Sequence, residues 1–290
     1  MTLSLFLEQL LNGVQLGVML FLMASGLTLV FGIMNFINLA HGSLYMAGAF
    51  AAAVAQQATG SFVLAIVAGV VAAALLGIVL ERAILQRFYT RSHLDQVLAT
   101  FAIILILNET TRMIFGPSPL RMSLPHALSG SVPILPGVPY PTYRLVVLLA
   151  GLVVAGLLYL VIMRTRMGMW VRAGASDRTT ASSMGVNVPV VFSGLFGMGA
   201  ALAGLAGILA APILSVQVGM GEPVLILALV VTVLGGVGSI RGAFFAALLV
   251  GVVDTFGRVL LTPALGSMAI FVTMAIILAF RPRGMFATHG

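Results

Sequence analysis

Residues 32–49 read Gly-Ile-Met-Asn-Phe-Ile-Asn-Leu-Ala-His-Gly-Ser-Leu-Tyr-Met-Ala-Gly-Ala. Three polar side chains recur there at every third residue, Asn35, Asn38 and His41, and apolar segments of membrane-spanning character flank them on both sides. Hydrocarbon offers no hydrogen-bond partners, so buried polar groups and irregular backbone persist only inside protein or beside a watery cavity. The stretch therefore indicates either a turn at the membrane surface or the lining of a transport path.

The composition places the chain in a membrane. Of its 290 residues, 61% are hydrophobic and only 7% are charged, whereas about 25% of the residues in a soluble domain are charged. At about 20 residues per span plus loops, this length predicts an all-α, polytopic helical bundle of roughly eight to ten transmembrane helices, forming a single domain over residues 1–290. The candidate spans are 9–31, 36–56, 62–80, 97–115, 144–163, 191–211, 223–239, 243–261 and 267–280.

The positive charge predicts orientation in the bilayer. The net charge of +7 comes from fourteen arginines and no lysine against seven acids. If the nine spans alternate, ten arginines fall on one side of the membrane and four on or near the other, which puts the C-terminus in the cytoplasm and the N-terminus outside. If 36–56 is re-entrant, the N-terminus moves inside. Because the arginines sit between apolar runs, we expect no nucleic-acid partner.

Two long loops divide the apolar segments. The external loop, 116–143, holds seven of the twelve prolines and is expected to be a stiff, non-helical cap. In the internal loop, 164–189, small residues alternate with charged ones. We expect one short helix there, ended by a glycine in left-handed geometry, which can lie closely in a groove on a partner protein; the alternative is a solvated connector. The expected docking residues are Arg172, Ala173, Asp177, Ala181 and Gly185.

A second interrupted apolar segment lies in the other half of the chain, at Leu234-Gly-Gly-Val-Gly-Ser-Ile-Arg-Gly242. Paired interrupted helices in two halves indicate a transport site near the middle of the membrane. The alternative is that glycines such as Gly235 and Gly236 only allow helices to pack closely.

The chain lacks the residues of most catalytic sites. Without lysine there is no Walker A motif, without cysteine there is no thiol chemistry, and the four histidines lack metal-ligand spacing. We therefore expect no catalytic residue, no metal site and no enzymatic activity. The few intramembrane carboxylates include two that stand three or four residues from an arginine and are expected to form self-neutralising pairs. These pairs are Glu109 with Arg112 and Asp254 with Arg258.

Asn38 and His41 differ from those pairs because no opposite charge lies nearby. They are either part of a polar interfacial turn or hydrogen-bond donors in a cavity wall. Glycines at 32, 42 and 48 would let neighbouring backbones come close to these polar groups, which favours the cavity. The expected substrate path is therefore Asn35, Asn38, His41 and Gly42 in the first interrupted segment, with Gly235 and Gly236 in the second.

These stretches together resemble a known family. Asn35-Phe-Ile-Asn-Leu-Ala-His-Gly42 closely resembles the signature of LivH-type permeases of branched-chain amino-acid ABC importers. Other stretches match in the same order from near residue 13 to 286, including Glu81-Arg82 after the third span. They are Arg164-x-Arg-Met-Gly-x-x-x-Arg-Ala173 with Asp177, Ala181 and Met184-Gly-Val-Asn187; Val233-Leu-Gly-Gly-Val-Gly-Ser-Ile240; and Arg281-Pro-Arg-Gly284.

The resemblance implies a multi-pass permease subunit of a bacterial inner-membrane importer that moves a branched-chain or related amino acid by alternating access. It implies a second, LivM-like permease, two cytosolic ATPases, and a periplasmic or lipid-anchored solute-binding protein as partners. The internal loop would supply the coupling helix, and ATP would be used only by the partners, so no cofactor is expected in this chain.

Other functions stay open from the sequence. Ser43 and Arg241 stand where many relatives carry an acid and a proline, and the family also includes importers of urea, short amides and aromatic acids. A second alternative is a stand-alone secondary carrier or channel that works without ATPases.

Overall fold

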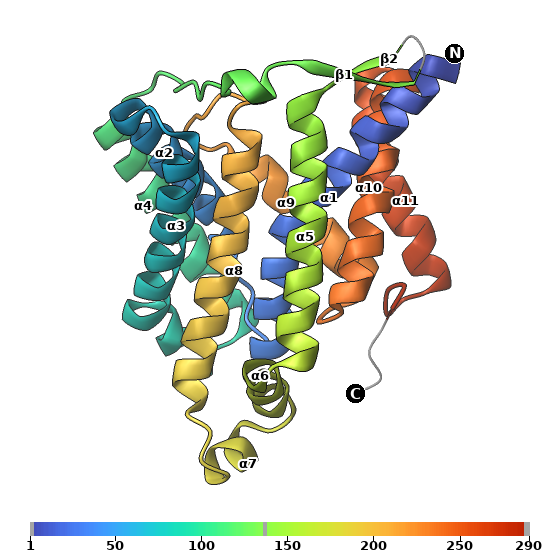
Figure 1. The fold of residues 1–290 in the computed structure, drawn as a ribbon. Coiled ribbons are helices and arrows are strands. Elements are labelled where there is room, and N and C mark those ends of the chain that lie inside the picture. Colours follow the sequence, from blue (N-terminus) through green and yellow to red (C-terminus); the bar gives the residue numbers. More distant parts are fainter. Residues whose placement is uncertain (1–2, 136–137, 287–290) are drawn as a thin grey trace.

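The structure, a computed structural model, describes residues 3–135 and 138–286. Within them the chain forms eleven α-helices, two 3₁₀ helices and one two-stranded hairpin (Figure 1). In chain order the elements are α1 (Leu3–Met34), α2 (His41–Thr59), α3 (Phe62–Ala83), η1 (Leu85–Phe88), α4 (His93–Phe115), η2 (His126–Leu128), β1 (Ser131–Leu135), β2 (Val138–Pro141), α5 (Thr142–Arg164), α6 (Arg166–Ser176), α7 (Arg178–Ser183), α8 (Val188–Ala210), α9 (Gly221–Gly235), α10 (Ile240–Leu260) and α11 (Pro263–Phe280).

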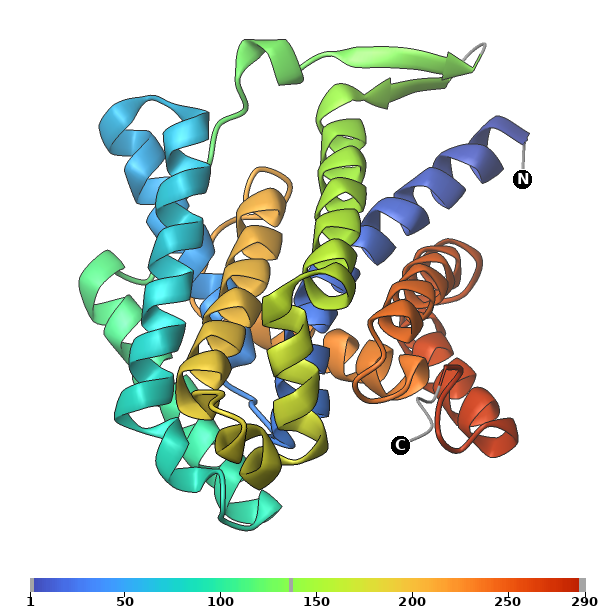
Figure 2. The same cartoon turned by 60° about the horizontal axis from the view of Figure 1, so that its bottom comes forward.

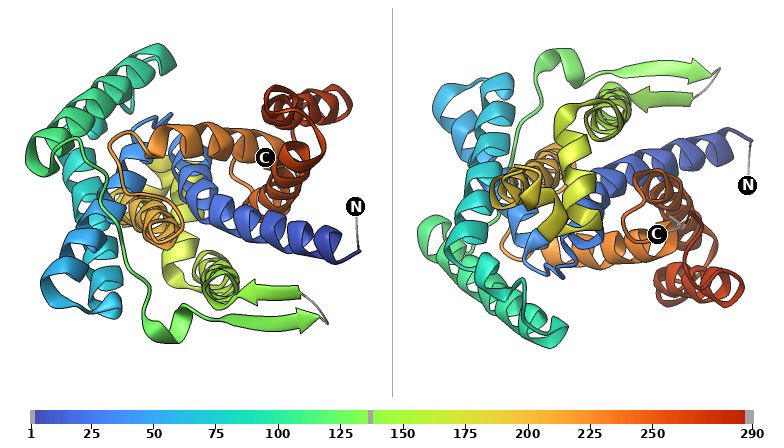
Figure 3. Two further views of the ribbon diagram at one scale, coloured as in Figure 1. Left: turned by 90° about the horizontal axis from the view of Figure 1, so that it is seen from above. Right: turned by 90° about the horizontal axis from the view of Figure 1, so that it is seen from below.

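Helices α1 and α8 form the centre of the bundle. In their most apolar windows 72% and 61% of residues are buried, against 17–22% in α3, α4 and α5. Helices α2 and α3 pack on α8, and α9 and α10 pack on α1. Figure 3 shows α4 and α11 at opposite outer edges. The outer helices turn apolar side chains away from the protein, as a lipid-facing surface requires.

The predicted membrane bundle is confirmed. Six of the described helices are long and apolar enough to cross a membrane, namely α1, α3, α4, α5, α8 and α10. Two apolar stretches are shorter, Gly221–Gly235 and Leu265–Phe280, and α2 has 19 residues rich in alanine and glycine. Each of the nine predicted spans overlaps one helix; 36–56 begins five residues before α2, and 223–239 extends four residues past the end of α9.

Successive helices of the bundle run in alternating directions. The hairpin and the start of α1 lie at one end of the molecule, which we call the hairpin end, and α6 and α7 lie at the opposite end, the loop end (Figures 1 and 2). Helix α11 runs toward the loop end (Figure 1). This is the arrangement expected for nine alternating segments, and which end faces the cytoplasm stays a prediction.

The proline-rich loop forms a cap across the hairpin end. Besides the short η2 it contains the antiparallel pair β1–β2, with Val132 opposite Tyr140. Strands form in this proline-rich segment because a two-stranded ribbon consists only of edges, where proline is tolerated. The side-chain amide of Gln56 fastens the cap to α2, since it donates to the Ser123 carbonyl at 2.7 Å and accepts from the Ser123 amide at 3.0 Å.

Candidate translocation path and coupling loop

The first interrupted segment is a true break between α1 and α2. The α1 helix ends at Met34, the chain continues without helical structure through 35–40, and α2 begins at His41. Asn35 has a φ of 52°, the one non-glycine with a positive φ among the described residues. Asparagine tolerates this left-handed conformation better than most side chains, so it can turn the chain out of the helix.

Side chains of α4 hold the backbone of the break. The amide of Ile37 donates to Oε1 of Gln96 at 3.1 Å, and the amide of Leu39 donates to Oγ1 of Thr100 at 3.3 Å. Gln96 also donates from Nε2 to the carbonyls of Phe88 and Arg91, where the chain turns into α4. Buried amides outside regular structure need such partners. The break is therefore a held structure and not a frayed helix end.

Asn38 and His41 are buried within this break. Each is only 1% exposed, and among the described residues neither the amide of Asn38 nor either ring nitrogen of His41 has a hydrogen-bond partner of good geometry. The Met23 backbone is close enough to the imidazole to interact electrostatically, without forming a well-aligned bond. An unpaired buried polar group costs about 1–3 kcal/mol. The pair therefore leaves hydrogen-bonding capacity unused among the described residues.

Glycines bring neighbouring backbones close to the pair. A Cβ atom on Gly26 of α1 would lie 2.9 Å from Nε2 of His41 and 2.6 Å from the carbonyl oxygen of Gly199 in α8. A Cβ on Gly42 would lie 2.8 Å from the carbonyl oxygen of Gly221, where α9 begins. Elements α1, α2, α8 and α9 thus meet around His41.

Asn35 does not share the surroundings of Asn38 and His41. It is exposed, while the other two are buried. Spacing of three places residues on one helix face only while the chain is helical, and the left-handed turn at Asn35 ends that regularity. The structure thus brings together Asn38, His41 and Gly42 but leaves Asn35 at the end of α1.

The second interrupted segment is also a break, and it touches the first. Helix α9 ends at Gly235, Gly236 and Gly238 have φ of 95° and 83°, and α10 begins at Ile240. A Cβ on Gly32 would overlap the Cα of Gly238. A cavity of about 490 Å³ lies beside this contact. Its lining includes Gly32, Arg172, Gly238 and Arg241 but neither Asn38 nor His41.

The internal loop differs from the single helix that we predicted. It forms two helices, α6 and α7, because the carboxylate of Asp177 accepts from the amides of Thr179 and Thr180 and starts a new helix. Asp177 is exposed, and the hydroxyl and amide of Thr180 hold the pKa of its carboxyl below the ordinary value. The expected ending is confirmed, since Gly185 has a φ of 85° and the side chain of Asn187 caps α8.

The predicted docking residues divide into two groups. Arg172, Ala173, Asp177 and Gly185 are exposed, whereas Ala181 is 3% exposed and packs inside its own chain. A guanidinium nitrogen of Arg172 donates to the carbonyl oxygen of Ile162 near the end of α5. The outward surface of α7 consists of short polar side chains. They are Thr179, Thr180, Ser182 and Ser183.

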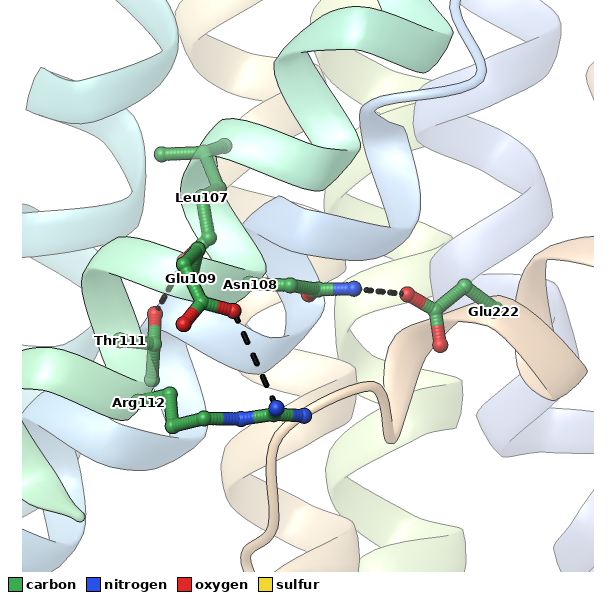
Figure 4. Close-up of polar contacts among 6 residues, drawn as sticks. All are labelled: Leu107, Asn108, Glu109, Thr111, Arg112 and Glu222. Carbon is green, nitrogen blue, oxygen red and sulfur yellow. Dashed lines mark hydrogen bonds and ion pairs between the residues drawn. The ribbon is translucent and has the colours of Figure 1, made fainter. Parts of the chain in front are cut away.

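Both predicted charge pairs are confirmed. The Glu109–Arg112 pair has an N–O distance of 3.9 Å on the exposed side of α4 (Figure 4). Nε of Arg258 donates to both carboxylate oxygens of Asp254 at 2.9 Å. Figure 4 also shows Asn108 of α4 pointing toward Glu222 at the start of α9, with a hydrogen bond of 2.6 Å.

Sequence reasoning missed a buried polar cluster near the loop end. The carboxylate of Glu81 is fully buried at the end of α3 and accepts from the Tyr89 hydroxyl at 2.5 Å and the Ser193 hydroxyl at 2.7 Å. The signal that could have indicated it is a carboxylate at the end of an apolar span. The contact with Ser193 on α8 had no such signal.

The chain is similar to known transport proteins over almost its whole length. A family model described as "Branched-chain amino acid transport system / permease component" matches residues 9–279. The chain is 28% identical to "High-affinity branched-chain amino acid transport system permease protein BraD" of Pseudomonas aeruginosa, over 97% of this chain and 95% of that protein. It is also 28% identical, with the same coverage, to "High-affinity branched-chain amino acid transport system permease protein LivH" of Escherichia coli. A solved structure, "PsaBC from Streptococcus pneumoniae in complex with Fab", aligns over 93% of this chain and 89% of that chain at 16% identity and a TM-score of 0.47.

Proposed function

The chain belongs to the family of branched-chain amino acid transport permease components, and on that premise we propose that it is the permease subunit of an ABC importer for branched-chain or related amino acids. The family is one of transport permeases and not of enzymes. Transport would proceed by alternating access, with ATP consumed by partner subunits and no cofactor bound here. We place the protein in the bacterial inner membrane, with α6 and α7 in the cytoplasm.

The partners in this proposal follow from the family and from the resemblance to LivH-type permeases. They are a second, LivM-like permease, two cytosolic ATPases that dock on the loop end, and a solute-binding protein at the hairpin end. The exposed polar surface of α7 supports docking, because short side chains allow a partner helix or groove to approach closely.

The observation that carries the proposal is the pair Asn38–His41. Two buried side chains without partners, in a break between helices and enclosed by glycines, offer hydrogen bonds to a polar solute that passes through an apolar surrounding. A purely structural role would be expected to leave these atoms paired within the protein.

The test is uptake by the complete complex in vesicles. With the two permeases, both ATPases and the binding protein present, we expect uptake of radiolabelled leucine to require ATP. An ATPase with an inactivated Walker A lysine serves as the control. Uptake by the permease alone, driven by a proton or sodium gradient, would contradict the proposal and favour a stand-alone carrier. Uptake of radiolabelled urea, acetamide or phenylalanine but not of leucine would assign a different substrate class.

A further inference from the structure

Arg178 joins the internal loop to the break between α1 and α2. It is the first residue of α7, and its Nη2 donates to the carbonyl oxygen of Met34 at 2.7 Å. Met34 is the last residue of α1, whose final carbonyls lack partners within the helix and carry a partial negative charge. A guanidinium is well suited to such a helix end, so this contact between residues 144 positions apart has a clear electrostatic cause.

The surroundings of Arg178 fix its direction. Its guanidinium lies over the ring of Phe192 in α8, 5.0 Å from the ring centroid. On the other side of Met34 the break is held by Phe36, whose ring meets Tyr89 edge-on at 5.4 Å. Tyr89 in turn donates to the buried Glu81. The end of α1 thus lies between α7 and the rigid polar cluster at the end of α3.

There is also room for this arrangement to change. A cavity of about 270 Å³ is lined by Arg178 and by Gln86, Tyr89, Val188, Pro189 and Phe192. Helix α7 has only six residues and exposes most of its other side chains, so a partner can bind it. Tightly packed interiors transmit displacement, whereas a cavity allows a side chain to move without overlap.

We propose that Arg178 is a positioning residue that transmits movement of α7 to the break carrying Asn38 and His41. This inference rests on the proposed function, since it assumes that an ATPase moves α7. When α7 shifts, the hydrogen bond to the Met34 carbonyl moves the end of α1 relative to α4, because Gln96 and Thr100 hold the other part of the break. The shift changes the surroundings of the two unpartnered side chains.

The experiment uses the absence of native cysteine, so that a single introduced thiol is the only one labelled. Leu39→Cys places a reporter in the break, where the side chain is half-buried. In the purified permease alone we expect Arg178→Ala to raise the alkylation rate of this reporter severalfold, because the end of α1 is no longer held. Arg166→Ala is the matched control, an exposed arginine in the same loop. An unchanged rate in Arg178→Ala would overturn the proposal.

In the complete complex we expect ATP with vanadate to change the alkylation rate of Leu39→Cys, and to change it equally in Arg166→Ala. With Arg178→Ala the nucleotide effect is lost although the ATPases still copurify and hydrolyse ATP, and Arg178→Lys restores it in part. A nucleotide effect that survives in Arg178→Ala would overturn the proposal. If the wild-type complex shows no ATP-dependent uptake, the proposed function fails instead, and the measurement on the permease alone still decides whether Arg178 holds the break.

Discussion

Single residues in and beside the break between α1 and α2 carry the proposed path. The amides of Ile37 and Leu39 beside Asn38 are bound by α4, while the side chains of Asn38 and His41 have no well-aligned hydrogen bond among the described residues. Their burial could not be read from the spacing alone, because Asn35 has the same spacing and is exposed. The left-handed turn at Asn35, which separates them, depends on how α4 holds the following residues.

For these two residues we predict that Asn38→Leu and His41→Leu each lower leucine uptake at least about tenfold, equivalent to about 1.4 kcal/mol of barrier. The purified permease should be as stable as the wild type or more so, because an apolar side chain removes an unpaired buried polar group. Ser25→Ala is the control, since Ser25 is buried but donates to Leu22 in its own helix. Near-normal uptake by both leucine variants would return these residues to the role of an interfacial turn.

Asp177 supports a second prediction, about pH. Its pKa lies below the ordinary value of 3.8 because Thr180 and Thr179 donate to the ionised carboxylate. A lowered pKa means that the cap contributes stability above the ordinary pKa and loses it as the pH falls through the folded one. We therefore expect protease cleavage within 164–189 to be independent of this group between pH 6 and 8. At pH 7, Asp177→Ala should be cleaved faster, while Asp177→Asn, also a good cap, stays close to wild type. Equal cleavage of the alanine variant and wild type would show that the cap does not hold α7.

At the scale of elements, local signals predicted more than contacts between elements. Asn187 and Pro189 predicted the start of α8, and Gly185 predicted the end of α7, because caps depend on a few neighbouring residues. The split of the internal loop at Asp177 was missed, since the charges suited either one helix or two. The α9–α10 break was predicted, but its contact with Gly32 joins distant parts of the chain.

Close packing between α2 and α8 gives the third prediction. A Cβ on Gly48 would lie 2.5 Å from the Cα of Gly204, whereas a Cβ on Gly156 in α5 meets nothing within 4 Å. We expect Gly48→Ala to lower the free energy of unfolding by about 1–3 kcal/mol through overpacking. Gly156→Ala should leave it unchanged or raise it, because alanine favours helices by about 1 kcal/mol. Denaturant unfolding in detergent measures both free energies. Equal changes for the two variants would mean that the close packing of α2 on α8 does not contribute to stability.

At the scale of the whole molecule, the arginine pattern predicts the orientation. The ten arginines assigned to one side lie within α6 or α7, or at or beside helix ends that point toward the loop end, while Arg112, Arg121, Arg144 and Arg258 belong to segments near the hairpin end. The alternation of helices could be predicted because apolar length is a local property. The joining of Arg178 to Met34 could not, because nothing near either residue specifies the other.

We therefore predict that Ser176→Cys resists a membrane-impermeant thiol reagent in intact cells, while Gln57→Cys, exposed at the hairpin end of α2, is labelled. Thr288, a further site predicted to face the cytoplasm, lies outside the described residues. Permeabilising the cells should make both introduced cysteines reactive. The reverse labelling pattern would invert the orientation and move the ATPase partners to the other end.

The way α4 is attached has a consequence for the membrane around it. Hydrogen bonds attach α4 to the rest of the protein at two heights. Gln96 and Thr100 form the first set, and Asn108 forms the second. Most of the apolar side chains of α4 face outward. Because these apolar side chains would meet acyl chains in the proposed membrane setting, we expect bilayer thickness to affect the height of this helix. Because the same helix holds the amides of Ile37 and Leu39, such a shift reaches the break directly. On the proposed function, we therefore expect the transport rate to depend on bilayer thickness.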